Sequence, residues 1–349
     1  MTSSPKPTHP GLRGRRRKVI SDADKPLVSS TLLASGDSLP VVREPTVDGL
    51  DPISWAASHR AEIEEQLVDH GAVLFRNFDV RSPERFHRFV EAVSGEPLSY
   101  MERSSPRHQI SRNIYTSTDH PADQSIFPHN EHSYKFAFPL HICFYCHRPA
   151  QRGGATPLAD CRRIYERLKP AHRRRFEERG YLYVRNYSEQ CGLPWQTVFQ
   201  TEDRAEVEAY CRQADIEWEW LDGDHLRTRQ RRRVSGRHPQ SGAHTWFNHM
   251  TFFHVTTLEP VLRDTLLNEY GEEGLPHHTL YGDGSPIETE VMEDLRQLYR
   301  EAMVSFPWQR GDVLLIDNML TAHGRDPYAG PRKVCVAMSR PVSWCDVPH

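Results

Sequence analysis

Long apolar runs are missing from this sequence. The longest ones, such as Val313 to Ile316, fall far short of the roughly 20 residues that a membrane helix needs, and no apolar segment follows the basic residues near the N-terminus. Mean hydropathy is −0.68, and 26% of the residues are charged, which indicates a well-solvated surface. We therefore expect a globular cytoplasmic protein without a membrane segment.

Cysteine is scarce, and its pattern argues against two common uses. Seven cysteines, an odd number, are scattered over 349 residues, which disfavours a secreted disulfide framework. Cys143 and Cys146 form one C-x-x-C pair, but a structural zinc site needs four ligands and no second pair completes it. We interpret these two cysteines as apolar residues on a strand.

An excess of positive charge is also missing. The net charge of −3 argues against a nucleic-acid-binding protein, although basic clusters occur at Arg13 to Lys18 and at Arg227 to Arg233. Residues 1–40 mix Pro, Ser, Gly and Arg without periodicity, so we expect a flexible basic arm there. No aromatic residue is interleaved with Arg13 to Lys18, and a solvated tail is therefore preferred over a partner-binding or nucleic-acid-binding arm.

Residues 41–349 have the patterns of a single domain with a β core and peripheral helices. Helical spacing runs from Ile53 to Gly71, and Ser82 followed by Pro83 is typical of the start of a second helix. There is no internal repeat. The expected strands cover residues 72–78, 140–145, 181–184, 245–248, 313–316 and 334–338, and further helices are expected near Cys161 and at residues 203–212 and 286–302.

One histidine and one glutamate have the spacing of a metal-binding pair. Of the twenty histidines, only His129 is followed two positions later by an acidic residue, Glu131. Roughly three such matches are expected by chance, so the pair is weak evidence by itself. On an extended segment, residues i and i+2 point the same way, so both side chains can bind one ion. Two histidines and one carboxylate would hold iron(II) on one face and leave positions open.

The third ligand has to come from elsewhere in the sequence. His323 is the best candidate, because the apolar strand Val313 to Ile316 leads into a segment that can place a side chain at the mouth of a barrel. His249 and His254 fit this argument less well.

Several ordered segments, taken together, resemble a known family. They are PHNEHSY, GGATPLAD, VFQTED, HTWFNHMTFFH and GDVLLIDNMLTAHGRDPYAGPRKVCVAM. The sequence resembles the taurine dioxygenase-like iron(II)/2-oxoglutarate oxygenases over roughly residues 45–340, and within them the syringomycin-type amino-acid hydroxylases of nonribosomal peptide pathways. The resemblance implies a mainly β fold, the double-stranded β-helix or jelly-roll, cupin-like barrel, with peripheral helices.

The resemblance also implies a role for individual residues. His129, Glu131 and His323 would be the iron(II) ligands, Arg332 would pair with the distal carboxylate of 2-oxoglutarate, and Thr156 would donate a hydroxyl hydrogen bond to the same carboxylate. A guanidinium can pair bidentately with a carboxylate, and Arg332 lies just before the expected strand 334–338. The alternative for Arg332 is a surface arginine without a ligand. The alternative for Thr156 is a β-branched strand residue whose hydroxyl bonds only to neighbouring backbone.

The implied reaction is hydroxylation of an unactivated C–H bond of an amino acid, with 2-oxoglutarate and O₂ as cosubstrates. Glu131 stands where related halogenases have a small residue, so halogenation is disfavoured. Desaturation and cyclisation use the same cofactors and remain open. A non-redox metal-binding barrel or zinc-type hydrolase would use the same histidines but would not explain Arg332 and Thr156.

Basic residues outside the motifs are candidates for substrate or partner binding. Arg103, Arg107, Arg227 and Arg229 lie in segments that could border the mouth of the barrel, although a solvated basic surface explains each equally well. The run Arg231 to Arg233 is a candidate docking site for an acidic peptidyl carrier protein that presents a tethered amino acid. The alternative from another functional class is a non-catalytic module. It would bind a carrier protein or nucleic acid through its basic segments, and its histidines would have no role in metal binding.

Overall fold

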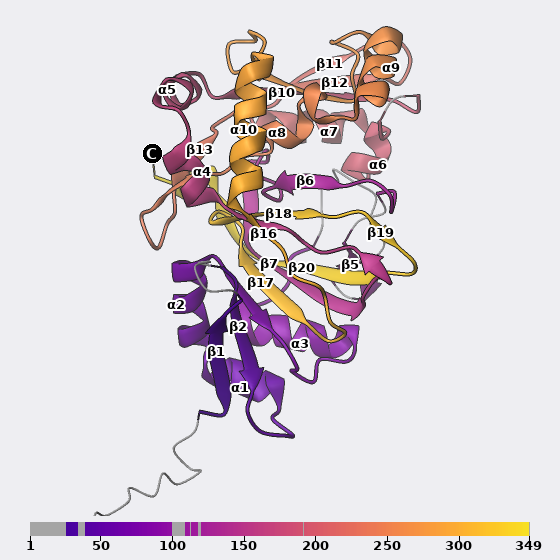
Figure 1. Cartoon of the computed structure of the whole chain (residues 1–349). Helices are drawn as coiled ribbons and strands as arrows, with labels where there is room; N and C mark the ends of the chain where they lie inside the picture. Colours follow the sequence, from indigo (N-terminus) through magenta and orange to yellow (C-terminus); the bar gives the residue numbers. More distant parts are fainter. Residues whose placement is uncertain are drawn as a thin grey trace, which may run out of the picture.

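A large sheet and a smaller sheet form the core of the protein. The computed structural model describes residues 26–33, 39–99, 109–111, 113–117, 120–190 and 192–348. The large sheet contains, in spatial order, β1 (Val28–Leu32), β2 (Val41–Pro45), β3 (Ala72–Phe75), β17 (Val313–Asp317), β7 (Ala137–Arg148), β20 (Lys333–Ser343), β5 (Ile114–Thr116) and β4 (Gln109–Ser111). The smaller sheet contains β16 (Met303–Val304), β9 (Leu158–Asp160), β18 (Thr321–Arg325) and β6 (Ile126–His129). Together they make the jelly-roll that the sequence predicts (Figure 1).

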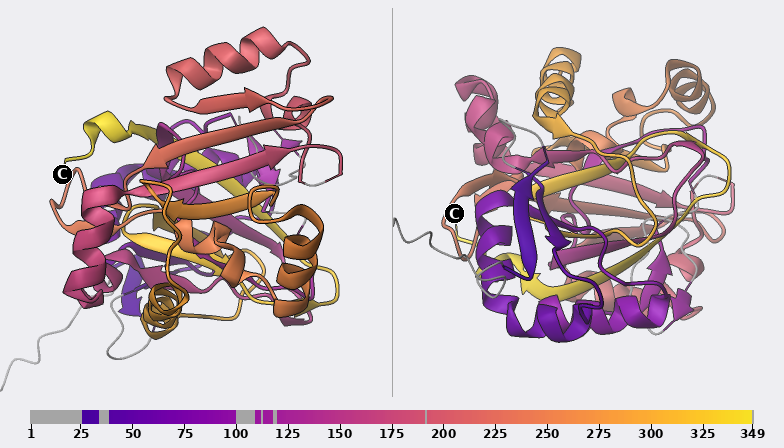
Figure 2. Two further views of the ribbon diagram at one scale, coloured as in Figure 1. Left: turned by 90° about the horizontal axis from the view of Figure 1, so that it is seen from above. Right: turned by 60° about the horizontal axis from the view of Figure 1, so that its bottom comes forward.

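Both faces of the central strands β3, β17 and β7 are buried, which explains their near-continuous apolar sequences. Along β7, successive side chains point to opposite faces. Cys143 and Tyr145 pack against the helices α1 (Pro52–Ser58), α2 (Arg60–His70) and α3 (Pro83–Ser94), whereas Ile142, Phe144 and Cys146 pack in the interior. These helices lie in the lower part of the molecule in Figure 1, around β1 and β2, and along the left and lower edges in the right view of Figure 2.

The other side of the barrel carries an insertion with its own sheet. This sheet contains β11 (Glu217–Trp220), β12 (Leu226–Arg232), β10 (Tyr181–Tyr187) and β15 (His277–Tyr281). Two short ribbons pair β13 (Ser235–Arg237) with β14 (His244–Trp246) and β19 (Tyr328–Ala329) with β8 (Arg152–Gly153). The helices of this side are α4 (Cys161–Arg167), α5 (Pro170–Arg179), α6 (Trp195–Phe199), α7 (Arg204–Gln213), α8 (Met250–Phe253), α9 (Pro260–Tyr270) and α10 (Thr289–Ala302), with the 3-10 turns η2 (Val255–Thr257) and η3 (Trp344–Asp346).

Most expected elements are present, with some differences. The strand expected at residues 72–78 is β3, which ends at Phe75. The helical segment from Ile53 is divided at His59 into α1 and α2. The strand expected at residues 245–248 is β14, which ends at Trp246. The arm expected over residues 1–40 is wrong for Val28–Leu32, because this segment pairs with β2 as strand β1. The cluster Arg13 to Lys18 lies outside the described residues.

The predicted start of α3 and the interpretation of the two cysteines are confirmed. Ser82 caps α3 through a hydrogen bond from the Arg85 backbone N–H, and Pro83 follows it. Cys143 and Cys146 are buried on β7, on opposite faces. They therefore serve as apolar strand residues. No helix in the described part of the chain is long and apolar enough to cross a membrane.

Acid is expected to destabilise the fold through a buried histidine on β7. His141 is buried beside Ser94, and burial lowers its pKa to about 4 from the ordinary 6.5. The unfolded chain takes up a proton at this residue below pH 6.5 and the folded chain does not, so stability falls as the pH drops from 6.5 to 4. Urea unfolding at pH 7.5 and pH 4.5 should show about 2–3 kcal/mol less acid destabilisation in His141→Gln than in wild type. Equal losses would contradict this assignment.

Candidate functional site

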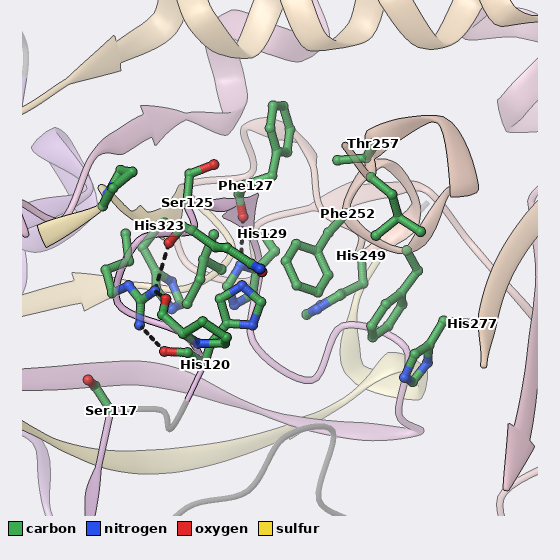
Figure 3. A pocket seen from close by; sticks show the side chains of 18 of the residues that line it. Ser117, His120, Ser125, Phe127, His129, His249, Phe252, Thr257, His277 and His323 are labelled. Carbon is green, nitrogen blue, oxygen red and sulfur yellow. Dashed lines mark hydrogen bonds between the residues drawn. The ribbon is translucent and has the colours of Figure 1, made fainter. Parts of the chain in front are cut away.

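Three potential metal ligands meet where two strands of the smaller sheet pair. His129 is the last residue of β6, Glu131 follows two positions later, and His323 lies in β18 directly opposite His129 in the ladder. One ligand atom from each residue lies within 4.8 Å of the others. Figure 3 shows His129 and His323 next to each other in the cavity. Residues distant in sequence are thus brought together by strand pairing.

The hydrogen bonding of His129 makes one ring nitrogen available to a metal. Its Nδ1 donates to the Phe127 carbonyl oxygen at 2.9 Å, which leaves the lone pair on Nε2. Nε2 lies 3.8 Å from Oε2 of Glu131. Two cis ligands bound at ~2.1 Å lie ~3 Å apart, so a shift of less than ~1 Å would bring this pair onto one ion. Two imidazoles and a carboxylate are the donor set of a facial iron(II) site.

The two oxygens of Glu131 face different histidines. Oε2 faces His129, whereas Oε1 lies 3.2 Å from Nε2 of His132. His132 has a left-handed backbone (φ 57°), which turns the chain sharply after the ligand segment. Glu131 is only 2% exposed. This arrangement offers one carboxylate oxygen to the metal position.

A cavity of about 890 Å³ opens in front of the three ligands. Its wall contains Arg332 and Thr156, the residues expected to bind 2-oxoglutarate, together with Arg325. Aromatic and histidine side chains also line the cavity, among them Phe253 and His249, Phe252 and His277 (Figure 3). The structure therefore places all five residues of the expected metal and cosubstrate sites on one cavity.

Arg332 is held in the cavity wall without a carboxylate partner among the described residues. Its Nε donates to the Gly154 carbonyl oxygen at 3.0 Å, and its guanidinium lies 5.4 Å from the centroid of the Tyr328 ring. Burial, and then the charge of Arg325, lower the pKa of Arg332 to about 10. A carboxylate of a ligand would relieve this unfavourable burial of charge.

The hydroxyl of Thr156 is oriented by a tryptophan. Nε1 of Trp308 donates to Oγ1 of Thr156 at 3.1 Å, and Thr156 is only 3% exposed. Because the oxygen accepts this bond, its own proton is available to a second acceptor. Thr156 and Arg332 therefore fit an anionic cosubstrate such as 2-oxoglutarate.

Sequence reasoning missed Arg325, a second arginine on the cavity. Its guanidinium donates to the carbonyl oxygens of His120, Pro121 and Gln124 at 2.9, 2.5 and 2.7 Å. It also lies 5.2 Å from the Tyr328 ring centroid, on which Arg332 packs as well. The sequence pattern that could have identified Arg325 is its position two residues after His323. On one strand, this spacing directs both side chains to the same side.

The arginines proposed for substrate binding have other surroundings. Arg227 and Arg229 are on β12 and pair with Glu219 of the neighbouring strand β11, at 4.0 and 3.3 Å. Neither contributes to the cavity wall, so the expectation that they border its mouth is wrong. Arg103 and Arg107 lie outside the described residues.

The basic run Arg231 to Arg233 is also engaged within the molecule. Arg231 pairs with Glu217, at 3.5 Å. Arg232 donates to the carbonyl oxygens of Tyr134 and Ala214, and Arg233 donates to those of Val347 and Pro348. These contacts tie β12 and the C-terminal segment to the rest of the fold.

Comparison with known proteins identifies the family. The model of the taurine catabolism dioxygenase TauD, TfdA family matches residues 32–338. The chain belongs to the TauD/TfdA dioxygenase family. It is an enzyme that uses iron(II), 2-oxoglutarate and O₂.

Relatives of this TauD/TfdA dioxygenase include the dapdiamide synthesis protein DdaC of Enterobacter agglomerans, which is 41% identical over 280 residues that cover 80% of this chain and 85% of DdaC. A clavaminate synthase-like protein of Arabidopsis thaliana is 32% identical over 289 residues, covering 80% and 84%. The crystal structure of PvcB from Pseudomonas aeruginosa has the same fold, with a TM-score of 0.54 and 15% identity over 94% of this chain and 95% of PvcB.

Proposed function

We propose that this TauD/TfdA dioxygenase hydroxylates an unactivated C–H bond of an amino-acid-type substrate in natural-product biosynthesis, with His129, Glu131 and His323 as iron ligands. One observation carries the proposal. The three ligand atoms lie within 4.8 Å of one another on a cavity that Arg332 and Thr156 also line. The relationship to a dapdiamide synthesis protein supports the biosynthetic setting.

The chain's own residues bind, orient and shield the reactants. His129, Glu131 and His323 would hold iron by one face, and Arg332 and Thr156 would bind the distal carboxylate of 2-oxoglutarate. When bound, iron with 2-oxoglutarate and O₂ supplies the oxidising power for attack on a C–H bond, with succinate and carbon dioxide as coproducts. The apolar rings of Phe144, Phe252 and Phe253 line the cavity and exclude water from it.

Halogenation and a non-redox metal site are disfavoured on specific grounds. Glu131 provides the carboxylate that a halide would have to replace, so halogenation is disfavoured. A non-redox metal site would not require Arg332 and Thr156 on the same cavity. Desaturation or cyclisation of an amino-acid-derived substrate would use these residues equally, and product analysis by mass spectrometry separates them, since hydroxylation adds one oxygen atom.

The substrate is proposed to be a free amino-acid-type molecule that the enzyme meets in the cytoplasm, where thiols stay reduced. The run Arg231 to Arg233, suggested for a carrier protein, already has internal partners. A member of a panel of free amino acids should therefore stimulate succinate formation by the wild-type enzyme. The same amino acid should give no stimulation with the Glu131→Gln variant. Stimulation only by carrier-bound aminoacyl thioesters would instead establish the tethered alternative.

Thr156→Val is expected to weaken 2-oxoglutarate binding about 10- to 100-fold, because a hydrogen bond to a charged group contributes about 1.5–3 kcal/mol. Valine keeps the shape of the side chain and removes the hydroxyl. Isothermal titration of the iron-loaded protein with 2-oxoglutarate under anaerobic conditions measures the change. Thr156→Ser keeps the hydroxyl and should bind close to wild type. Unchanged affinity in Thr156→Val would remove Thr156 from the cosubstrate site.

A further inference from the structure

The metal carboxylate sits on a backbone segment that extends beyond its strand. β6 ends at His129, so Glu131 lies outside the ladder that pairs His129 with His323. Glu131 is nevertheless buried, at 2% exposure. Its backbone N–H and carbonyl therefore need hydrogen-bond partners other than a neighbouring strand.

A single asparagine side chain supplies both of those partners. The Glu131 backbone N–H donates to Oδ1 of Asn318 at 2.8 Å, and Nδ2 of Asn318 donates to the Glu131 carbonyl oxygen at 2.8 Å. The same Nδ2 donates to the Pro139 carbonyl oxygen at 2.9 Å. The carboxamide of Asn318 thus pairs with Glu131 as a peptide group of an adjacent strand would.

The contact is reciprocated by the residue between the two ligands. Nδ2 of Asn130 donates to the Asn318 carbonyl oxygen at 2.7 Å, and both asparagines are fully buried. The Asn130 carbonyl oxygen in turn accepts from Nδ1 of His249 at 2.8 Å. Each asparagine side chain therefore bonds to the backbone of the segment that carries the other. We call Asn130 and Asn318 the asparagine brace.

The brace joins the two segments that provide the metal ligands. Asn130 lies between His129 and Glu131, and Asn318 lies in the turn between β17 and β18, five residues before His323. The turn is itself anchored by Asp317, whose Oδ1 accepts from the backbone N–H groups of Met319 and Leu320 at 2.9 Å. A rigid turn with two reciprocal amide contacts leaves Glu131 little freedom to move away from the histidines.

We propose that Asn318 and Asn130 are positioning residues that preorganise Glu131 for the metal before any metal binds. The proposal rests on the ligand assignment made above. Partners of metal ligands typically change metal affinity 10- to 100-fold when removed. Asn318→Ala removes the pairing with Glu131 and is expected to weaken metal binding by that factor, without touching any ligand atom.

A purely structural role would lower stability without changing metal affinity, and a matched control separates the two roles. Asn186 on β10 is buried to the same degree, and its Nδ2 donates to the carbonyl oxygens of Glu273 and Leu275 at 2.8 and 2.7 Å. It therefore loses the same kind of bonds as Asn318 when replaced by alanine. It is absent from the cavity wall and from the group of ligands.

The test titrates the full-length apo-protein with manganese(II) by calorimetry, well below the unfolding temperature of each variant. Asn318→Ala should bind manganese(II) 10- to 100-fold more weakly than wild type, whereas Asn186→Ala should stay within threefold. If Asn318→Ala does not fold, Asn130→Ala, which loses the bond to the Asn318 carbonyl, takes its place with the same expectation of weaker binding.

The His129→Ala variant distinguishes a failure of the brace proposal from a failure of the ligand assignment. Loss of binding in His129→Ala with wild-type affinity in the folded brace variant would overturn the proposed brace and leave the ligand assignment intact. Full binding in His129→Ala would instead overturn the ligand assignment itself, and the brace proposal with it. Equal weakening in Asn318→Ala and Asn186→Ala would assign both residues to general stability and would also contradict the brace.

Discussion

Glu131→Gln is expected to lower iron(II) affinity by more than about 100-fold and to abolish 2-oxoglutarate turnover. The substitution keeps the shape of the side chain but removes its negative charge and replaces one ligand oxygen with an amide nitrogen. Removal of a partner of a metal ligand already costs 10- to 100-fold, so loss of the ligand itself should cost more. Anaerobic calorimetry with iron(II) gives the affinity, and succinate formation gives the turnover.

A glutamate on the same cavity provides the control for this change. Glu259 precedes α9 and lines the cavity, but it is not one of the grouped ligands. Glu259→Gln makes the same chemical change there and should leave iron(II) affinity within twofold of wild type. Wild-type iron affinity in Glu131→Gln, or an equal loss in both variants, would contradict the role assigned to Glu131.

Arg332→Met is expected to weaken 2-oxoglutarate binding by about 2–5 kcal/mol, which corresponds to a loss of about 30- to 5,000-fold. Methionine keeps much of the apolar stem and removes the guanidinium that the distal carboxylate would meet. Arg332→Lys should recover part of the loss, because lysine keeps the charge but lacks the planar fork. The iron(II) affinity should stay unchanged in both variants, so binding of 2-oxoglutarate to iron-loaded protein is the quantity to measure.

The neighbouring cation controls for a general loss of positive charge. Lys333 is exposed and begins β20, so Lys333→Met removes one charge beside the cavity without removing a lining side chain. It should bind 2-oxoglutarate within threefold of wild type. A similar loss in Lys333→Met and Arg332→Met would mean that long-range charge, and not contact, governs the affinity.

The parts of the site that sequence could predict follow from local geometry. On an extended segment, the spacing of His129 and Glu131 places both side chains on one side, so the pair could be identified as candidate ligands. The apolar run before His323 indicated a strand, and this strand, β17, is followed by a turn and then by β18, which carries His323 in the other sheet. Arg332 and Thr156 required the family resemblance, because neither has a local pattern of its own.

The parts that could not be predicted depend on contacts between distant segments. Arg227 and Arg229 were candidates for substrate binding, but the register of β12 with β11 places Glu219 beside them. Strand β1 lies at the edge of the large sheet. It was not predicted, because it lies in a segment rich in serine and proline. No local pattern marks Asn318, since its pairing with Glu131 spans 187 positions.

The most direct test of the central claim is an anaerobic titration of the iron(II)-loaded wild-type protein with 2-oxoglutarate, followed by visible absorption. Chelation of 2-oxoglutarate by iron at His129, Glu131 and His323 predicts a weak visible charge-transfer band, diminished in Glu131→Ala and in Arg332→Ala. A folded wild-type protein that contains iron and shows no band at saturating 2-oxoglutarate would contradict the assignment of this cavity as the dioxygenase site.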